Sequence, residues 1–241
     1  MIRIGLFILL SLLGLGVGLA SQHQDTDVVG SAAESLLKAR FQRAGVAYPP
    51  ARIQLIALKE PKRLELWAWA QRKWRHIHDY AVLAASGHAG PKLREGDKQV
   101  PEGFYRIAAL NPNSNFHLSM KLDYPNAYDW EHALEEGREK PGSDIFIHGS
   151  ALSTGCLAVG DKYVEELYAL ISSIGKENVQ VMIVPYDFRT RTFSASVKRP
   201  SWLQQLYAYL QARISQFPLS AKMKDCPNQC LVHQGWYKPS N

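Results

Sequence analysis

One short stretch, residues 144–161, places the strongest constraint on how this chain can fold and on what it can do. Its sequence is D-I-F-I-H-G-S-A-L-S-T-G-C-L-A-V-G-D. The apolar run Ile145–Ile147 predicts a buried strand that ends at His148, and a loop of small residues then leads to Cys156. A helix that Asp161 can cap should follow, because apolar residues recur on one face at Val164, Leu167, Tyr168 and Ile171. One imidazole and one thiol are therefore expected on neighbouring loop ends.

A thiol and an imidazole in this arrangement can perform nucleophilic catalysis. A free thiol, with a pKa of about 8.5, is mostly protonated at neutral pH, and a nearby imidazole can take its proton to form a reactive ion pair. The oxyanion that follows needs backbone N–H donors with no side chain in the way, which Gly155 provides. The alternative is that Cys156 is a small buried apolar residue and His148 a hydrogen-bonded polar group. The residue types alone leave both interpretations open.

The segment H-G-S-A-L-S-T-G-C resembles the signature of the YkuD-type L,D-transpeptidases, cysteine enzymes that remodel bacterial peptidoglycan. In that family a His-Gly pair precedes a Ser/Thr-His-Gly-Cys block, followed by a hydrophobic residue and then Arg or Asn. The matching positions are His148, Gly149, Ser153, Gly155, Cys156 and Leu157. Two positions differ, since Thr154 stands where the family has His and Ala158 where it has Arg or Asn. The His-to-Cys spacing is also shorter than in most members.

Two further segments resemble the YafK-like branch of that family. They are G-P-K-L-R-E-G-D-K-Q-V-P-E-G-F-Y at Gly90–Tyr105 and N-P-N-S at Asn111–Ser114. The resemblance implies a mainly β fold with flanking helices (α+β), the YkuD-type β-sandwich, over a catalytic domain at residues 51–190. The alternating pattern of residues 52–86, with polar turns between short apolar runs, independently predicts an antiparallel sandwich or meander.

The resemblance also implies a reaction. Cys156 would attack the carbonyl at the L-centre of diaminopimelate in a peptidoglycan stem peptide, with His148 as base and then acid. The backbone N–H groups of Gly155 and Cys156 are the predicted oxyanion hole, and no cofactor is needed. A thioester on Cys156 can pass to an amine, which is transpeptidation, or to water, which is hydrolysis.

Hydrolysis is at least as strongly indicated as cross-linking. The YafK-like branch includes members that cut the link between peptidoglycan and a covalently attached lipoprotein, and Ala158 removes a polar anchor beside the nucleophile. A peptidoglycan-attached lipoprotein is thus a candidate partner besides the stem peptides. The alternative from another class is a non-catalytic protein that binds or scaffolds the cell wall on the same fold.

Six further residues are candidates for orienting His148 or for binding substrate. The loop at residues 87–103 leads to the substrate cleft of the resembling family, and its lysine can meet a peptide carboxylate. Turns and surface ion pairs that hold this loop are the structural alternative for each of its charged residues. The six candidates are Gly149, Ser150, Ser153, Lys92, Tyr124 and Asn126.

The ends of the chain are expected to lie outside the catalytic domain. Residues 1–20 read as a signal peptide, with one arginine and a long apolar run; an uncleaved anchor is the alternative, although the run is short for a span of about 20 residues. Export to the periplasm follows, with no stable membrane span after cleavage. Residues 21–50 predict a helix and linker, with the helix at 31–47. Residues 191–241 predict an amphipathic helix from 202 to 214 and a tail.

Charge and cysteine usage narrow the class of protein. Removal of residues 1–20 leaves 27 basic against 22 acidic residues, an excess that suits a solubilising surface or an anionic polymer. No basic run interleaved with aromatic residues indicates a nucleic-acid site. In an exported protein Cys226 and Cys230 should pair as a disulfide, which leaves Cys156 as the odd thiol. No metal site is predicted, because His233 is the only extra ligand near that pair.

Overall fold

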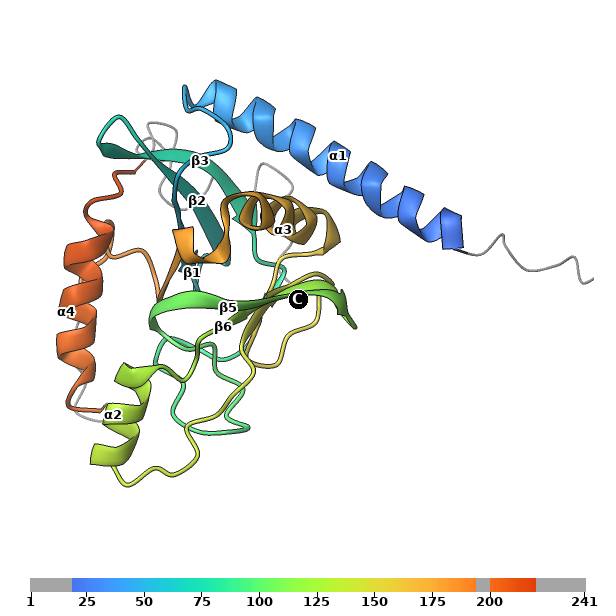
Figure 1. Ribbon diagram of the computed structural model, residues 1–241. Helices are drawn as coiled ribbons and strands as arrows, with labels where there is room; N and C mark the ends of the chain where they lie inside the picture. The colour runs from blue at the N-terminus through green and yellow to red at the C-terminus, as the bar shows by residue number, and fades with distance from the viewer. Residues whose placement is uncertain (1–18, 194–199, 220–241) are drawn as a thin grey trace, which may run out of the picture.

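The computed structural model describes residues 19–193 and 200–219 (Figure 1). Its elements are α1 (Leu19–Arg43), β1 (Ile53–Leu58), β2 (Arg63–Ala70), β3 (Lys73–Ala81), β4 (Ala84–Ala85), β5 (Gly103–Ser114), β6 (His117–Leu122), α2 (Ala127–Glu135), β7 (Phe146–His148), β8 (Leu157–Ala158), α3 (Asp161–Ile174), η1 (Lys176–Asn178), β9 (Val179–Val184) and α4 (Leu203–Ile214). Residues 1–18, Cys226 and Cys230 lie outside the described residues, so signal cleavage and the disulfide stay predictions. No helix of the described part is long and apolar enough to cross a membrane.

The described strands form one mixed sheet in the order β3-β2-β1-β9-β5-β6-β7-β8-β4. With its flanking helices it confirms the predicted α+β class. The β1-β2-β3 meander is antiparallel as predicted, with Leu55 opposite Leu66. The sheet is not antiparallel throughout, however, because β9 lies between β1 and β5 and runs parallel to β1, with Leu55 opposite Val181. Such a pair needs a long crossover connection, which local alternation in the sequence cannot reveal.

Strand β5 joins the two halves of the sheet. Its first residues, from Gly103 to Arg106, pair with β9, and its later residues, from Ile107 to Ser114, pair with β6. The register shifts between Ile107 and Ala109, where one half passes into the other. The strands β6, β7 and β8 that carry the 144–161 segment are thereby attached to the β1-β2-β3 meander.

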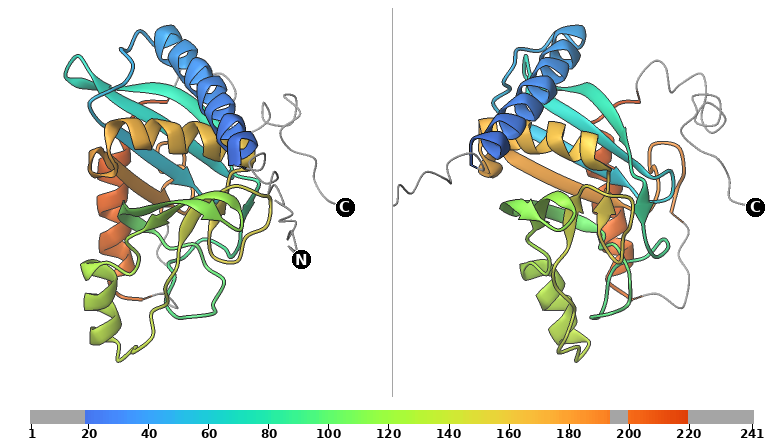
Figure 2. Two further views of the ribbon diagram at one scale, coloured as in Figure 1. Left: turned by 45° about the vertical axis from the view of Figure 1, so that its right-hand side comes forward. Right: turned by 90° about the vertical axis from the view of Figure 1, so that its right-hand side faces the viewer.

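Two apolar clusters lie on opposite sides of the sheet. One includes residues of α1 and α3, and the other lies beneath α4 (Figure 2). Strand β1 contributes to both, since Leu55 and Ala57 belong to the first cluster and Ile56 and Leu58 to the second. Each fully buried leucine or isoleucine stabilises the fold by roughly 1.5–3 kcal/mol. The predicted C-terminal amphipathic helix is confirmed as α4, whose Leu206 and Leu210 are buried.

The N-terminal helix differs from its predicted limits of 31–47. It spans Leu19–Arg43 and ends before Gly45, whose φ of 65° suits the left-handed residue that follows a helix C-terminus. The helix lies along α3, and the Arg40 guanidinium donates to the buried Glu166 carboxylate at 2.9 Å. This ion pair fixes α1 against the helix that follows Cys156.

Candidate active site

The parallel pairing of β7 with β8 brings the chain segments of His148 and Cys156 to the same part of the sheet. His148 lies opposite Ala158 in this pair. Cys156 directly precedes β8, which spans Leu157–Ala158. The thiol and the imidazole predicted from the sequence therefore belong to two adjoining chain segments.

His148 is buried and held in one orientation. The residue is 2% exposed, and its Nδ1 donates to the carbonyl oxygen of Gly149 at 2.5 Å. Because a carbonyl can only accept, the proton of the neutral ring sits on Nδ1 and leaves the lone pair on Nε2. The Phe116 ring packs over the imidazole at a centroid distance of 4.6 Å. Burial lowers the pKa of His148, which the Gly149 carbonyl opposes, so the ring is a neutral base at pH 7.

The Cys156 thiol is not paired with His148 in this structure. Its Sγ lies 3.7 Å from the carbonyl oxygen of Asp144. Burial raises the pKa of the Cys156 thiol, while the backbone N–H of Phe146 and the charge of Lys92 act in the opposite direction. These directions favour a neutral thiol and a neutral imidazole at rest. A reaction at Cys156 would then need proton transfer during the attack.

Both predicted oxyanion donors already have hydroxyl acceptors. The N–H of Gly155 donates to Ser86 Oγ at 2.6 Å, and the N–H of Cys156 donates to Ser153 Oγ at 3.1 Å. The Ser153 hydroxyl itself donates to the Cys156 carbonyl oxygen at 2.6 Å. The Ser153 hydroxyl is thus in contact with the backbone of Cys156 on both sides of that residue's peptide groups. Ser86 was missed, because nothing in its local sequence indicates that β4 pairs with β8.

Two glycines of the motif allow close approach of neighbouring groups. A Cβ at Gly149 would lie 2.5 Å from Asp161 Oδ1 and 2.6 Å from the carbonyl oxygen of Phe116, distances that no side chain can occupy. Gly155 has a φ of 95°, in the region that favours glycine. Gly149, next to His148, and Gly155, next to Cys156, are therefore positions where a side chain would be unfavourable.

Asp161 does not cap α3, which corrects the prediction from its position. The N-cap is Gly160, without a side-chain cap, and Asp161 is the first residue of the helix. Its Oδ1 accepts instead from the backbone N–H of Ser150 at 2.7 Å. Ser150 has a φ of 62°, which turns its N–H toward α3. The Asp161 carboxylate therefore binds the loop that follows β7 and does not cap the helix.

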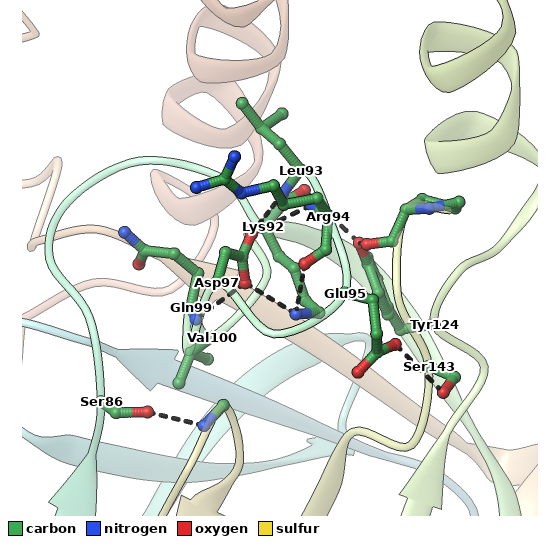
Figure 3. A network of polar contacts seen from close by, with 12 residues as sticks. Ser86, Lys92, Leu93, Arg94, Glu95, Asp97, Gln99, Val100, Tyr124 and Ser143 are labelled. Atoms are coloured by element: carbon green, nitrogen blue, oxygen red, sulfur yellow. Dashed lines mark hydrogen bonds and ion pairs between the residues drawn. The ribbon is translucent and has the colours of Figure 1, made fainter. Parts of the chain in front are cut away.

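Lys92 stabilises the loop at residues 87–103 and is not free to bind a peptide carboxylate. Figure 3 shows the network around Asp97, whose carboxylate accepts from Lys92 Nζ at 2.7 Å and from the backbone N–H groups of Leu93, Arg94 and Gln99. The Lys92 side chain is 4% exposed. The same figure shows Ser86 at the start of this loop, bonded to the backbone of Gly155. The loop thus acts as a rigid frame beside the thiol.

Tyr124 and Asn126 also have structural partners. The Tyr124 hydroxyl, in a buried residue, donates to the carbonyl oxygen of Pro141 at 2.7 Å. Asn126 caps α2 in a reciprocal capping box with Asp129, and its amide donates to the carbonyl oxygen of Phe104 at 2.9 Å. This cap begins helix α2, which extends to Glu135. Neither predicted substrate contact is directed at Cys156.

Comparison with known proteins agrees with the geometry. The family described as the L,D-transpeptidase catalytic domain, YkuD, matches residues 55–202. The chain belongs to the YkuD family. The match extends past the predicted domain limit at residue 190 and reaches the residue before α4. A YkuD domain is the catalytic part of L,D-transpeptidase-type enzymes, so the coarse assignment to peptidoglycan chemistry follows from the family.

Individual known proteins are similar to parts of this chain, at 29% sequence identity or less. The chain is 29% identical over 177 residues to YafK of Escherichia coli (strain K12), named as a candidate L,D-transpeptidase, covering 71% of this chain and 67% of that protein. Among solved structures, the helical cell shape determining protein Pgp2 of Campylobacter jejuni is 21% identical, with a TM-score of 0.45 over 68% of this chain and 57% of that one. Bd1075 of Bdellovibrio bacteriovorus is 19% identical, with a TM-score of 0.41 over 69% of this chain and 55% of that one. The structural similarities are too low to support a statement about function.

Proposed function

We propose that this YkuD domain is a cysteine acyl-enzyme that acts on peptidoglycan stem peptides at the L-centre of diaminopimelate. The observation that carries the proposal is the neutral His148, whose Nδ1 is fixed by Gly149 while its Nε2 has no hydrogen-bond partner among the described residues. Cys156 directly precedes β8, which pairs with the strand that ends at His148, within a domain whose family is catalytic. Export to the periplasm is part of the proposal, supported by the family's substrate and the apolar segment at residues 1–20.

The first half of the reaction forms a thioester. Nε2 of His148 takes the proton of the Cys156 thiol as Sγ attacks the carbonyl carbon, and a tetrahedral oxyanion results. The oxyanion replaces the hydroxyls of Ser86 and Ser153 as acceptor of the Gly155 and Cys156 N–H groups. Because hydrogen bonds to a charged acceptor are roughly twice as strong as neutral ones, this exchange favours the intermediate. Collapse breaks the C–N bond, and the His148 imidazolium protonates the leaving amine.

The second half decides the name of the reaction, and we propose hydrolysis. Water, deprotonated by His148, attacks the thioester, which releases a carboxylate and restores the thiol. The support is Ala158, a fully buried apolar residue opposite His148 at a position where the resembling family has Arg or Asn. Without that polar group, an acceptor amine has one anchor fewer beside the thioester. The proposed natural substrate is the amide that links a lipoprotein to peptidoglycan.

The test uses purified protein and two substrates. Sacculi that carry bound lipoprotein and, separately, tetrapeptide muropeptides are incubated with wild type and with Cys156→Ala, and the products are followed by mass spectrometry. Release of lipoprotein by the wild type alone, without new 3–3 cross-linked dimers, supports the hydrolase. New dimers with the lipoprotein link intact would assign transpeptidation. No wild-type product from either substrate would favour the cell-wall-binding alternative.

A further inference from the structure

One peptide group connects the imidazole to a carboxylate that the mechanism has not used. The carbonyl oxygen of Gly149 accepts from His148 Nδ1 at 2.5 Å, and the N–H of Ser150 donates to Asp161 Oδ1 at 2.7 Å. These two polar groups belong to the same amide, the bond between Gly149 and Ser150, which is planar and rigid. Two hydrogen bonds therefore connect the Asp161 carboxylate, through one peptide group, to the histidine ring.

The surroundings hold this peptide in place. Asp161 Oδ1 and the carbonyl oxygen of Phe116 both lie close to Gly149, since an added Cβ there would be 2.5 Å and 2.6 Å from these two oxygens. Ser150 keeps a left-handed φ of 62°, which is uncommon for a residue with a side chain and persists only where the surroundings support it. The bond to Asp161 is a polar contact that holds the Ser150 N–H in this conformation.

We propose that Asp161 is a positioning residue for His148, acting through the Gly149–Ser150 peptide as a carboxylate–peptide–imidazole relay. A carboxylate that accepts from the N–H polarises the amide, and its carbonyl oxygen becomes a stronger acceptor. That oxygen then stabilises the Nδ1–H of the imidazolium that forms when Nε2 takes the thiol proton. The relay keeps the reactive tautomer and raises the basicity of Nε2. Its meaning for catalysis rests on the proposed function, but its physical effect on His148 does not.

The same corner contains a matched control. Glu165, one turn further along α3, accepts from His117 Nε2 at 2.6 Å, and His117 lies against Gly149. Glu165→Gln removes a carboxylate charge from the same helix without contacting the Gly149–Ser150 peptide. The ionisable groups of this corner are thus Asp161, Glu165 and His117. Asp161→Asn keeps an acceptor oxygen and removes the charge, whereas Asp161→Ala removes both.

The test measures the tautomer and pKa of His148 by ¹⁵N NMR, together with the pH profile of Cys156 alkylation by iodoacetamide; neither measurement needs a substrate. We expect Asp161→Ala to mix the two neutral tautomers and Asp161→Asn to keep the Nδ1–H form. Both variants should lower the pKa of His148, and Glu165→Gln should shift it least. Where turnover is measurable, kcat should fall about tenfold to a hundredfold in Asp161→Ala with little change in KM, the range seen for outer groups that orient a reactive ligand.

Several outcomes separate this proposal from its alternatives. If Asp161→Ala and Asp161→Asn keep the wild-type tautomer, His148 pKa and alkylation profile, the relay is wrong, even if stability or turnover has dropped. If Asp161→Ala does not fold, the pKa of His148 in Asp161→Asn decides. A shift in Glu165→Gln as large as in Asp161→Asn would assign the effect to general charge and overturn the relay. A shift confined to the Asp161 variants, in a protein without activity on peptidoglycan, would keep the relay and reject the proposed function.

Discussion

The polar contacts differ between the two ends of the loop at residues 87–103. Glu102, near its end, pairs with a charged lysine, whereas Ser86, just before its start, offers a neutral hydroxyl to the backbone beside Cys156. The Glu102 side chain is 0% exposed and accepts from Lys59 Nζ at 2.9 Å, from the N–H of Gly90 at 2.8 Å and from the Tyr207 hydroxyl. Lys59 Nζ also donates to the carbonyl oxygens of Gly90 and Val100. Charge here is matched by charge, and each ion has several partners.

At the other end of the loop the acceptors are neutral. Ser86 and Ser153 provide hydroxyls to the backbone N–H groups beside Cys156, and no carboxylate contacts those donors. A neutral hydroxyl can be displaced by an oxyanion, whereas a carboxylate acceptor would compete with it. The loop is thus held by ion pairs around Glu102 and by neutral hydroxyl acceptors beside Cys156, which an oxyanion could displace under the proposed mechanism.

The largest expected effect is a loss of turnover with little change in the free energy of unfolding. Cys156→Ala and His148→Ala should each lower turnover by at least about a thousandfold, because no other group forms the thioester or moves its proton. Mass-spectrometric turnover assays on sacculi measure this. Cys156→Ala should change the free energy of unfolding by no more than about 1 kcal/mol, since the half-buried sulfur has one weak contact. Residual activity above one tenth of wild type would remove Cys156 from the mechanism.

A large loss of stability is expected instead from a substitution at Glu102, near the end of the loop at residues 87–103. Glu102→Gln should destabilise the protein by about 3–5 kcal/mol, because Lys59 would remain buried without its counter-charge. Urea unfolding of the variant and of wild type measures the difference. The control is Glu60→Gln, which breaks an exposed pair with Arg191 and should cost less than about 1 kcal/mol. A Glu102→Gln protein as stable as the control would show that the buried charges are not needed for rigidity.

A half-buried histidine, His78, provides a comparison with His148. Burial, and next the charge of Arg40, lower the pKa of His78 to about 4, with smaller effects of His76 and Arg43 and an opposing one of Asp79. An unfolded histidine takes up its proton near pH 6.5, and the folded one only near pH 4, so this contribution to stability is lost as the pH falls between these values.

The test of that contrast is a change in pH slope. We expect the free energy of unfolding of wild type to fall more steeply from pH 7 to pH 5 than that of His78→Leu, measured in urea at both values. Asp129 acts with the opposite sign in part of this window, because burial raises its pKa to about 6. It is present in both proteins, so the difference between them isolates His78. Equal slopes would contradict the assignment.

The smallest expected effect concerns Ser86, whose hydroxyl accepts from the backbone N–H of Gly155. Ser86→Ala leaves the Gly155 N–H without its hydroxyl and should destabilise the fold by about 1 kcal/mol. Turnover should stay within about threefold of wild type, because the hydroxyl competes with the oxyanion and does not assist it. Steady-state kinetics and urea unfolding of the same preparation measure both values. A hundredfold loss of kcat in a folded variant would instead make Ser86 part of the catalytic group.

The sequence by itself indicated the β1-β2-β3 meander, the C-terminal helix and the candidate pair His148 and Cys156. Period-two alternation around Leu55 and helical spacing around Leu206 are local patterns. The second predicts the buried face of α4, whereas β1 is buried on both of its faces. The segment from His148 to Cys156 was identifiable because an apolar strand, glycines and a thiol follow one another within a few residues. These features require no knowledge of distant parts of the chain.

Only the tertiary structure decided which groups those residues contact. The position of β9 beside β1, the hydroxyl of Ser86 on Gly155 and the ring of Phe116 on His148 all join segments far apart in the sequence. A hydrogen bond forms only where packing brings donor and acceptor within about 3 Å, and local periodicity does not determine such distances. For the same reason Lys92 and Asp161 were recognised as polar residues near the site, but their partners, Asp97 and the N–H of Ser150, became clear only in the folded chain.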